Sequence, residues 1–437
     1  GIGGRIEFNT KKATALDEPV LKFRYDTQYN EYSKSGNNPK YSLTYGDKIT
    51  ENFGAIFGYT FQSKDIVSNN NEVGYEPWAV DNNGNKYLAR DWEMRFYDLT
   101  REREGMTIDM DFEYSPNTSF FANYLFNEYV DDEIRHKDEY RARNVVESSI
   151  TSTSAAYQRI TADKETRKRI ETRQIKTQIV GGETNLGDLN FKFQASNSFA
   201  EEADDNNVDA KFRSECRIRE GDEICGTYNW SNPQFIDLVL APAASDLLDP
   251  SSYGWDEFEI DYGVIQDEEK AVKFDFENEN FELLSTPMVL QFGYKYSTRT
   301  KSNTEGNIDG SDAMSPLGMI SYSPYTPDKW YFPQTLGFFA DPDLLFGAQD
   351  QFRPLDVDLA DFWETEEEIN ALYLMSTFDY GNAVIVAGVR HENTSFNTFG
   401  YNDGDINDVL SFNRDYGFTA PSICLLYTSP SPRDTAL

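Results

Sequence analysis

Histidine, cysteine and long apolar runs are scarce in this sequence. There are two histidines among 437 residues, so little imidazole is available for acid–base catalysis or metal binding. His136 and His391 have no nucleophile motif beside them, and carboxylates are so numerous that no glycosidase-type pair stands out. No run approaches 18 apolar residues, so no transmembrane helix is predicted. We predict a protein that is not an enzyme and holds no metal or cofactor.

Basic residues are also few. The chain has 40 Lys and Arg against 75 Asp and Glu, a formal net charge of −35, which repels phosphate backbones and excludes nucleic acid as a partner of the bulk surface. The segments Asp204–Asp209 and Asp403–Asp408 space their oxygen ligands as calcium loops do. The latter lacks the central glycine and terminal glutamate of such a loop, and the former is similar. We interpret both as solvated acidic loops.

Of the three cysteines, Cys216 and Cys225 are nine positions apart and Cys424 stands in the C-terminal tail. An exported chain meets an oxidising environment, so Cys216 and Cys225 are a candidate disulfide. The alternative is two free thiols, because a two-thiolate metal site has no histidine partner nearby.

Aromatic residues are abundant, with 27 Tyr and 31 Phe, and they fall in alternating patterns. From Met106 to Tyr114 apolar residues alternate with Thr107, Asp109, Asp111 and Glu113, which is the period of a strand. Turn residues 115–119 and a second alternating strand from Phe120 follow, so a hairpin is predicted. Strands of about ten residues with one apolar face suit either a membrane barrel or a soluble sandwich.

The same alternation predicts about eleven strands. They are Leu21–Gln28, Lys40–Tyr45, Phe53–Phe61, Met106–Tyr114, Phe120–Asn127, Gln174–Ile179, Leu189–Gln194, Val272–Glu277, Met288–Tyr296, Ile369–Phe378 and Ala383–Glu392.

After the first strand, short turns alternate with four long connections, Lys64–Arg103, Asp131–Arg169, Glu201–Tyr262 and Thr298–Thr365. Short periplasmic turns and long extracellular loops are the pattern of an outer-membrane barrel. We therefore predict an all-β fold, an antiparallel transmembrane β-barrel.

Several segments resemble the TonB-dependent outer-membrane receptors: Arg101–Gly105 (REREG) with its following strand, Asp131–His136 (DDEIRH), and Gly388–Thr394 (GVRHENT), which is similar to a Gly-Val-Arg-x-Glu-x-Thr strand of that family. Within the family the pattern is closest to a carbohydrate-linked proteobacterial branch. The resemblance implies a plug domain followed by a barrel of about 22 strands. Residues 1–12 resemble the C-terminal end of the plug, and residues 13–423 the N-terminal half of the barrel.

The tail Cys424–Asp434 (CLLYTSPSPRD) resembles the translation of a transposase-type sequencing adapter. We therefore interpret residues 424–437 as an artefact and expect the natural chain to continue beyond Ile423. An incomplete barrel, about 11 of about 22 strands, would form an open sheet with two unpaired edges.

The family resemblance implies a Gram-negative cell outer membrane, contact with its lipid, active uptake of a scarce nutrient, and energy from the TonB–ExbB–ExbD complex acting through the missing plug region. An oligosaccharide is the expected ligand; the alternatives are a siderophore receptor, a passive channel, or a soluble acidic β-sandwich lectin. Aromatic residues in the long connections are candidate ligand-stacking residues: Trp78, Trp230, Trp255, Trp330 and Tyr331. The alternative for each is packing within the loops or at an interfacial aromatic girdle.

Overall fold

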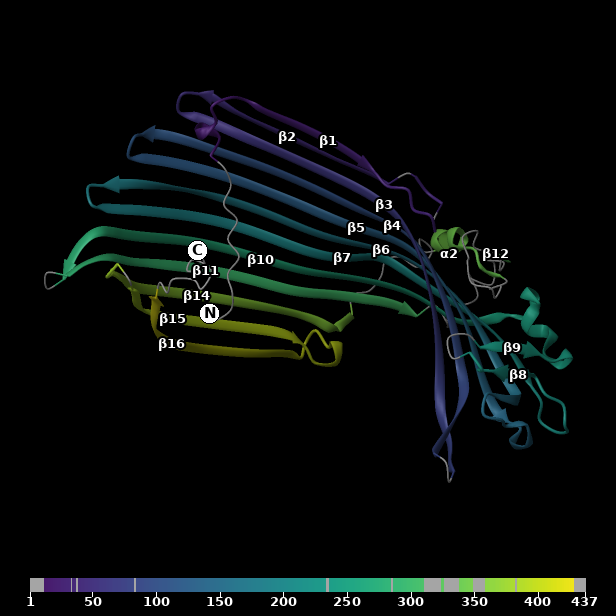
Figure 1. The fold of residues 1–437 in the computed structure, drawn as a ribbon. Helices are drawn as coiled ribbons and strands as arrows, with labels where there is room; N and C mark the ends of the chain where they lie inside the picture. The colour runs from purple at the N-terminus through teal and green to yellow at the C-terminus, as the bar shows by residue number, and fades with distance from the viewer. Residues whose placement is uncertain are drawn as a thin grey trace, which may run out of the picture.

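One large antiparallel sheet forms most of the molecule (Figure 1). The structure is a computed structural model that describes residues 12–32, 34–36, 38–81, 84–232, 236–283, 286–309, 324–325, 338–348, 358–381 and 383–427. Among these residues the sheet has 14 strands, and twelve of them follow one another in the order β1-β2-β3-β4-β5-β6-β7-β10-β11-β14-β15-β16.

The elements of the main sheet are β1 (Val20–Thr27), β2 (Pro39–Thr50), β3 (Phe53–Asp81), β4 (Gly84–Ser115), β5 (Thr118–Val145), β6 (Ser154–Leu186), β7 (Leu189–Arg217), β10 (Gly254–Leu283), β11 (Thr286–Asp309), β14 (Asp358–Asp379), β15 (Ala383–Tyr401) and β16 (Val409–Tyr427). The smaller elements are η1 (Ala13–Ala15), η2 (Glu147–Ser149), β8 (Gly226–Asn229), β9 (Asp237–Leu240), η3 (Pro242–Leu248), η4 (Pro250–Ser252), β12 (Pro324–Tyr325), β13 (Phe339–Ala340), α2 (Pro342–Ala348) and η6 (Asn402–Gly404).

The all-β class and the eleven predicted strands are confirmed, because each prediction falls on one strand of the sheet and the strands pair antiparallel in chain order. A twelfth strand, β16, was not predicted; it pairs along β15, with Leu425 opposite Ile385. In the described part of the chain β1 and β16 stand at the two ends of the strand order, so the sheet is open there. Figure 1 shows it as a long curved sheet.

The prediction that the long connections are loops is wrong for much of their length. Residues 64–81 continue β3 and residues 84–103 begin β4, so Lys64–Arg103 is a hairpin whose register closes at Asp81 opposite Gly84. Likewise, β5 and β6 run through most of Asp131–Arg169 and leave residues 146–153 between them. The short turns lie at one end of the sheet and the extended hairpins at the other (Figure 1).

Two kinds of contact explain why strands continue where the apolar alternation stops. On the face that carries Asp109, opposite charges lie across neighbouring strands: Arg169 is 3.6 Å from Glu133, and Arg213 is 2.7 Å from Asp163. Such cross-strand pairs favour strand pairing without apolar side chains. On the other face of the extensions a buried apolar cluster forms, which includes Trp92 and Phe258.

The apolar face of the hairpin that begins at Met106 continues across neighbouring strands as a band. The strand registers align its residues in cross-strand rows. One row is Leu43, Tyr59, Met106 and Phe126. Another is Phe191, Phe276, Phe292, Leu374 and Val389. Large side chains of this band are exposed, for example Met110 at 38%, Phe292 at 40% and Leu374 at 48%. We call it the apolar band, and the opposite side the polar face.

On the polar face, the segment before the first strand is fixed at the turn end. The buried carboxylate of Asp111 accepts hydrogen bonds from the backbone N–H groups of Ala13 (2.6 Å) and Thr14 (2.9 Å) and from the Thr14 hydroxyl. Gly54 makes room for this segment, because a Cβ there would lie 2.6 Å from the Cβ of Ala13. We call Asp111 and Gly54 the η1 socket.

Within the described residues, no helix has the length and apolar composition needed to cross a membrane. The loop interpretation of Asp204–Asp209 is wrong, because the segment lies within β7 and Asp209 accepts a hydrogen bond from Arg167 (2.5 Å). Asp403–Asp408 is a turn closed by its own bonds, among them Asn402 N–H to the Asp408 carbonyl at 2.9 Å.

Candidate ligand-binding cavity on the polar face

A cavity of about 640 Å³ lies on the polar face where the sheet passes from the apolar band to the extensions. Two consecutive cross-strand rows supply its inward-pointing side chains. The first row is Lys40, Gln62, Arg103, Tyr129, Arg173, Glu202 and Ile265, and the second is Thr60, Gly105, Asn127, Ile175, Ala200, Asp267 and Lys301. The strands from β2 to β11 therefore build one surface, since residues opposite each other in a ladder share a face.

Tyr129 stands near the middle of the first row, with one arginine on each side. The Arg103 guanidinium lies over the Tyr129 ring, 4.9 Å from the ring centroid. The Tyr129 hydroxyl donates to Asp131 at 3.1 Å. Asp131 also accepts a hydrogen bond from Arg101 at 3.2 Å. These bonds fix the position of the Tyr129 hydroxyl, and the amides of Gln62 and Asn127 line the same cavity. An aromatic ring among amides and guanidinium groups can stack on a cyclic polar ligand and bond its oxygens.

A second and smaller cavity, about 330 Å³, adjoins the first through Glu202 and Ile265. Its lining is strongly acidic, with Asp204, Asp261, Glu305, Asp358 and Asp361 beside Glu202. Burial, followed by the nearby carboxylates of Glu259 and Asp209, raises the pKa of Asp261 to about 6. Within the described residues, no group of three or more His, Cys, Asp or Glu side chains is arranged to hold a metal ion.

Of the aromatic residues that the sequence singles out, the two with described side chains, Trp230 and Trp255, line neither cavity. Trp230 is 8% exposed and belongs to the apolar cluster of the extensions. Trp255 packs against Phe212, with ring centroids 4.3 Å apart. Both side chains therefore pack within the protein, which is the alternative set beside ligand stacking above. The backbone of Trp78 belongs to β3, its side chain lies outside the described part, and Trp330 and Tyr331 fall outside the described residues.

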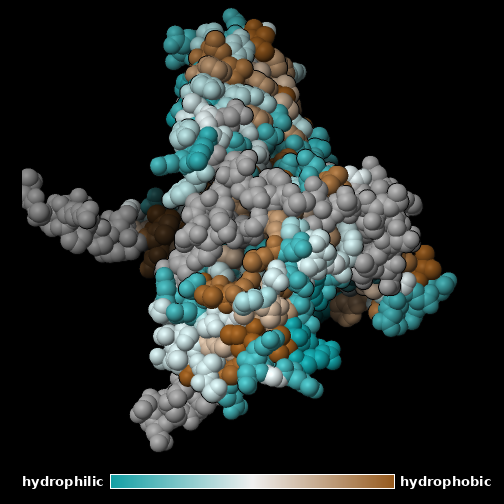
Figure 2. All heavy atoms as spheres, turned by 90° about the vertical axis from the view of Figure 1, so that its right-hand side faces the viewer, coloured by the Kyte–Doolittle hydropathy of each residue, from teal (hydrophilic) through white to brown (hydrophobic). Residues whose placement is uncertain are grey.

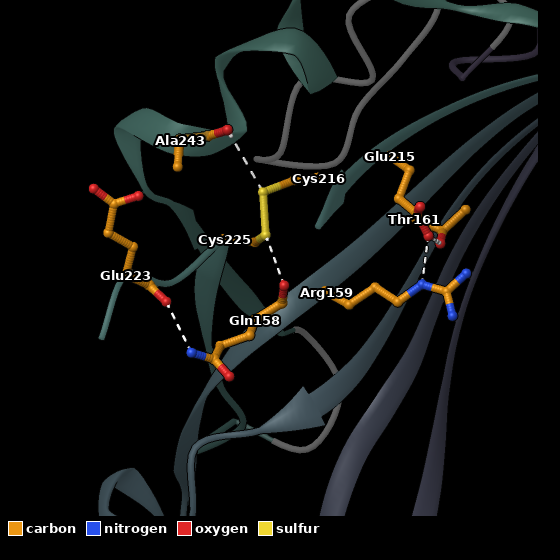
Figure 3. The surroundings of a disulfide bond; sticks show 8 residues. All are labelled: Gln158, Arg159, Thr161, Glu215, Cys216, Glu223, Cys225 and Ala243. Atoms are coloured by element: carbon orange, nitrogen blue, oxygen red, sulfur yellow. Dashed lines mark hydrogen bonds and ion pairs between the residues drawn. A yellow bond between two sulfur atoms is a disulfide. The ribbon is translucent and has the colours of Figure 1, made fainter. Parts of the chain in front are cut away.

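Cys216 and Cys225 form a disulfide with a Cα–Cα separation of 5.8 Å (Figure 3). The carbonyl oxygens of Gln158 and Ala243 lie 3.2 and 3.5 Å from its sulfur atoms. The Gln158 amide also donates to the Gly221 carbonyl at 2.9 Å. The bond thus closes the connection after β7 against the edge of β6, within the buried cluster and away from the cavity.

We call residues 338–348 the strap. Several buried polar side chains lie beneath it. Lys164 and Asp138 form an ion pair of 2.7 Å, with side chains 2% and 1% exposed, and the ammonium lies 5.2 Å from the ring centroids of Phe338 and Phe339. His136 is 1% exposed, and its Nδ1 is 3.1 Å from the Thr166 hydroxyl. Burial lowers the pKa of His136 to about 3.

Arg103, Tyr129 and Arg173 are among the cavity residues that reasoning from the sequence missed. Arg103 lies in the REREG segment that carries the family resemblance, but Arg103 and Arg173 also stand where predicted loops meet predicted strands. The sequence does contain a signal for them, because alternation continues beyond the apolar residues of the hairpin. Arg101, Arg103 and Gly105 alternate on one strand, and Tyr129 and Asn127 lie opposite Arg103 and Gly105 on the next.

Figure 2 views the molecule from the end that bears the extensions and shows hydrophilic and hydrophobic residues interspersed over its described surface. No protein-family model matches this sequence, and no curated protein matches it.

Proposed function

We propose that this chain is part of an outer-membrane TonB-dependent receptor that takes up a scarce nutrient, an oligosaccharide in the first instance. The observation that carries the proposal is the apolar band. Exposed side chains such as Phe274, Phe292 and Leu374 share one face of a sheet whose chain carries a net charge of −35. A soluble protein rarely leaves a contiguous apolar surface of this kind uncovered.

The other side of the same strands supports the receptor interpretation. A strand segment of about ten residues can cross a hydrocarbon layer of about 30 Å when tilted, with polar residues facing a wet lumen. The polar face carries the 640 Å³ cavity with Tyr129 and its amide and guanidinium neighbours. Band and cavity together suit an incomplete barrel wall that faces lipid on one side and ligand on the other.

Site-directed spin labels in lipid vesicles test the location of the band. Phe292 belongs to the apolar band, whereas the neighbouring Gln291 side chain bonds Glu277 on the polar face. In a Cys424→Ser background, we expect a label at position 292 to be accessible to oxygen dissolved in lipid and one at 291 to a water-soluble nickel chelate. Equal access of the nickel chelate to both labels, in a chain soluble without detergent, would favour the soluble lectin.

Uptake measurements separate the receptor from a passive channel. In cells that produce the parent receptor, accumulation of an oligosaccharide should stop when TonB is deleted and return when it is restored. Diffusion through a channel would continue without TonB. Uptake of a ferric siderophore in place of the sugar would support the iron-receptor alternative.

A further inference from the structure

The charge of the cavity is opposite to that of the protein. The inward-pointing residues include four cations, Lys40, Arg103, Arg173 and Lys301, against two anions, Glu202 and Asp267. Three glutamates, Glu104, Glu128 and Glu201, border the cavity from alternate strand positions, which direct side chains to the other face. The chain as a whole carries −35. A local excess of positive charge in so acidic a molecule attracts anions to the cavity.

Both anions of the cavity are already neutralised by neighbours. Glu202 forms an ion pair with Arg173 at 3.1 Å, and Arg173 forms a second ion pair with Glu171 at 2.8 Å. Asp267 accepts a hydrogen bond from Arg299 Nε at 2.8 Å. Three of the four cations, Arg103, Lys301 and Lys40, are then left over. In the described residues Arg103 and Lys301 have aromatic rings as partners, Tyr129 at 4.9 Å and Trp363 at 5.8 Å, and no carboxylate within ion-pair distance.

The third of these cations, Lys40, lies at the first edge of the cavity. It lies opposite Asp26 in the β1–β2 register, and Asp26 is itself bound by Arg24 at 2.6 Å. The guanidinium of Arg103 lies over the tyrosine ring. A planar guanidinium is suited to a carboxylate in two-pronged contact, whereas the lysines act as point charges.

We propose that this cavity binds an oligosaccharide that carries carboxylate groups, with Arg103 as the main carboxylate contact and Lys301 and Lys40 as supporting cations. Tyr129 and the amides of Gln62 and Asn127 contact the uncharged part of the sugar. The proposal rests on the proposed uptake function only in taking the polar face as the ligand side. It deepens that function, because the class of ligand is acidic and not neutral.

The test measures binding of three probes to the full chain in detergent or lipid by calorimetry. Tetragalacturonate carries the acidic groups, its fully methyl-esterified form is the same sugar without charge, and citrate is a carboxylate without sugar. We expect tetragalacturonate to bind at least ten-fold more tightly than the other two, and its affinity to fall as salt is raised from 50 to 500 mM. Equal affinity for the ester would overturn the role of charge, and equal affinity for citrate would overturn the role of the sugar.

Matched variants assign the effect to the cavity. Arg103→Gln and Lys301→Gln should each weaken tetragalacturonate binding about ten-fold, since each removes a charge-assisted contact. Arg103→Lys should retain more affinity than Arg103→Gln, and Lys270→Gln, which changes an exposed cation that pairs with Glu268, should have no effect. Amide exchange in β4 and β5 checks that each variant keeps the sheet. Unchanged affinity in both glutamine variants would refute the assignment.

The outcomes separate this proposal from the uptake function. If position 292 faces lipid and uptake depends on TonB, but the ester binds as well as the acid, the acidic ligand class alone fails. If the acid binds selectively to a chain that is soluble without detergent, the cavity assignment stands and the membrane function fails.

Discussion

At the scale of single residues, position in the sheet decides whether a charge binds, anchors or destabilises. Arg103 stays on the open face over Tyr129, Asp111 is buried under the segment that precedes the first strand, and Lys164 with Asp138 is sealed beneath the strap. A buried charge needs a partner, because water no longer solvates it. The sequence contains all these residue types many times over, so their roles come from their surroundings.

His136 should make the strap sensitive to acid. Its pKa is lowered to about 3 by burial, from an ordinary value near 6.5, so the unfolded region binds the proton more tightly than the folded one. The stabilising contribution is therefore present above pH 6.5 and is lost as the pH falls toward 3, by about 1.4 kcal/mol per pH unit. We expect the protection factors of the amides in Phe338–Ala348, which are exchange rates corrected for the intrinsic pH dependence of exchange, to fall on going from pH 7 to 4.5.

The control for this experiment uses the second histidine. Other groups, including Asp138 beneath the strap, also respond to acid, so the comparison is between variants at each pH. His136→Gln should reduce the acid sensitivity of the strap, while His391→Gln, at an exposed site beside Thr419, should leave it unchanged. An equal pH response in wild type and His136→Gln would show that another group controls the strap.

The η1 socket should hold the chain before the first strand. Asp111→Asn removes the charge that accepts hydrogen bonds from Ala13 and Thr14, and hydrogen bonds to a charged group contribute about 1.5–3 kcal/mol. We expect trypsin to cleave after Lys12 about ten-fold faster in this variant. Gly54→Ala should act in the same direction, because its Cβ collides with the backbone of Ala13 and Thr14.

Two substitutions on the same sheet serve as controls for the socket. Asp109→Asn alters a carboxylate on the same face that bonds Asn123, and Gly263→Ala adds a Cβ with an ordinary 3.5 Å contact to Glu305. Neither should change cleavage after Lys12. Cleavage at the wild-type rate in both Asp111→Asn and Gly54→Ala would show that the socket does not restrain the segment.

At the scale of elements, the strands have two zones with different chemistry. The first zone carries the apolar band opposite a polar face, and the second carries cross-strand ion pairs opposite a buried apolar cluster. In β4 the transition from the first zone to the second falls between Met106 and Trp92. The cavity lies on the polar face at the boundary between the two zones.

The hairpin of β4 and β5 allows a direct energetic test of which face meets lipid. In vesicles or detergent, Met110→Arg should reduce the free energy of unfolding by about 2–4 kcal/mol, the cost of an arginine on a lipid face near mid-membrane. Asp109→Arg, one residue away on the polar face, should cost far less. Urea titration followed by tryptophan fluorescence gives both values, and equal costs would contradict a lipid-facing band.

At the scale of the whole molecule, the sheet has a middle and two edges. β1 pairs only with β2 and β16 only with β15 in the described residues, whereas β5, β6 and β7 have a long partner on each side. Edge strands leave one row of backbone groups without a ladder partner. We expect amide exchange along β1 and β16 to be at least ten-fold faster than along β5 and β6, measured by mass spectrometry. Equal protection would show that the two edges are paired.

The sequence alone determined the all-β class, eleven strands and their order, because period-two alternation and turn residues are local signals that no distant contact needs to supply. It did not determine where strands end. Beyond Arg103 toward Asp81 the alternation of apolar residues fades, and β3 and β4 continue because Arg95, 3.2 Å from Glu72, and the buried Trp92 find partners on neighbouring strands.

The cavity was decided by tertiary structure alone. Arg103, Tyr129, Arg173 and Lys301 are separated by tens to hundreds of residues, and they share a surface because the strand registers place them in two adjacent rows of one face. A shift of one residue in any register would turn a cavity residue to the apolar face. The tryptophans illustrate the converse: composition marks Trp230 and Trp255 as available for a ligand, and the packing of the extensions covers them.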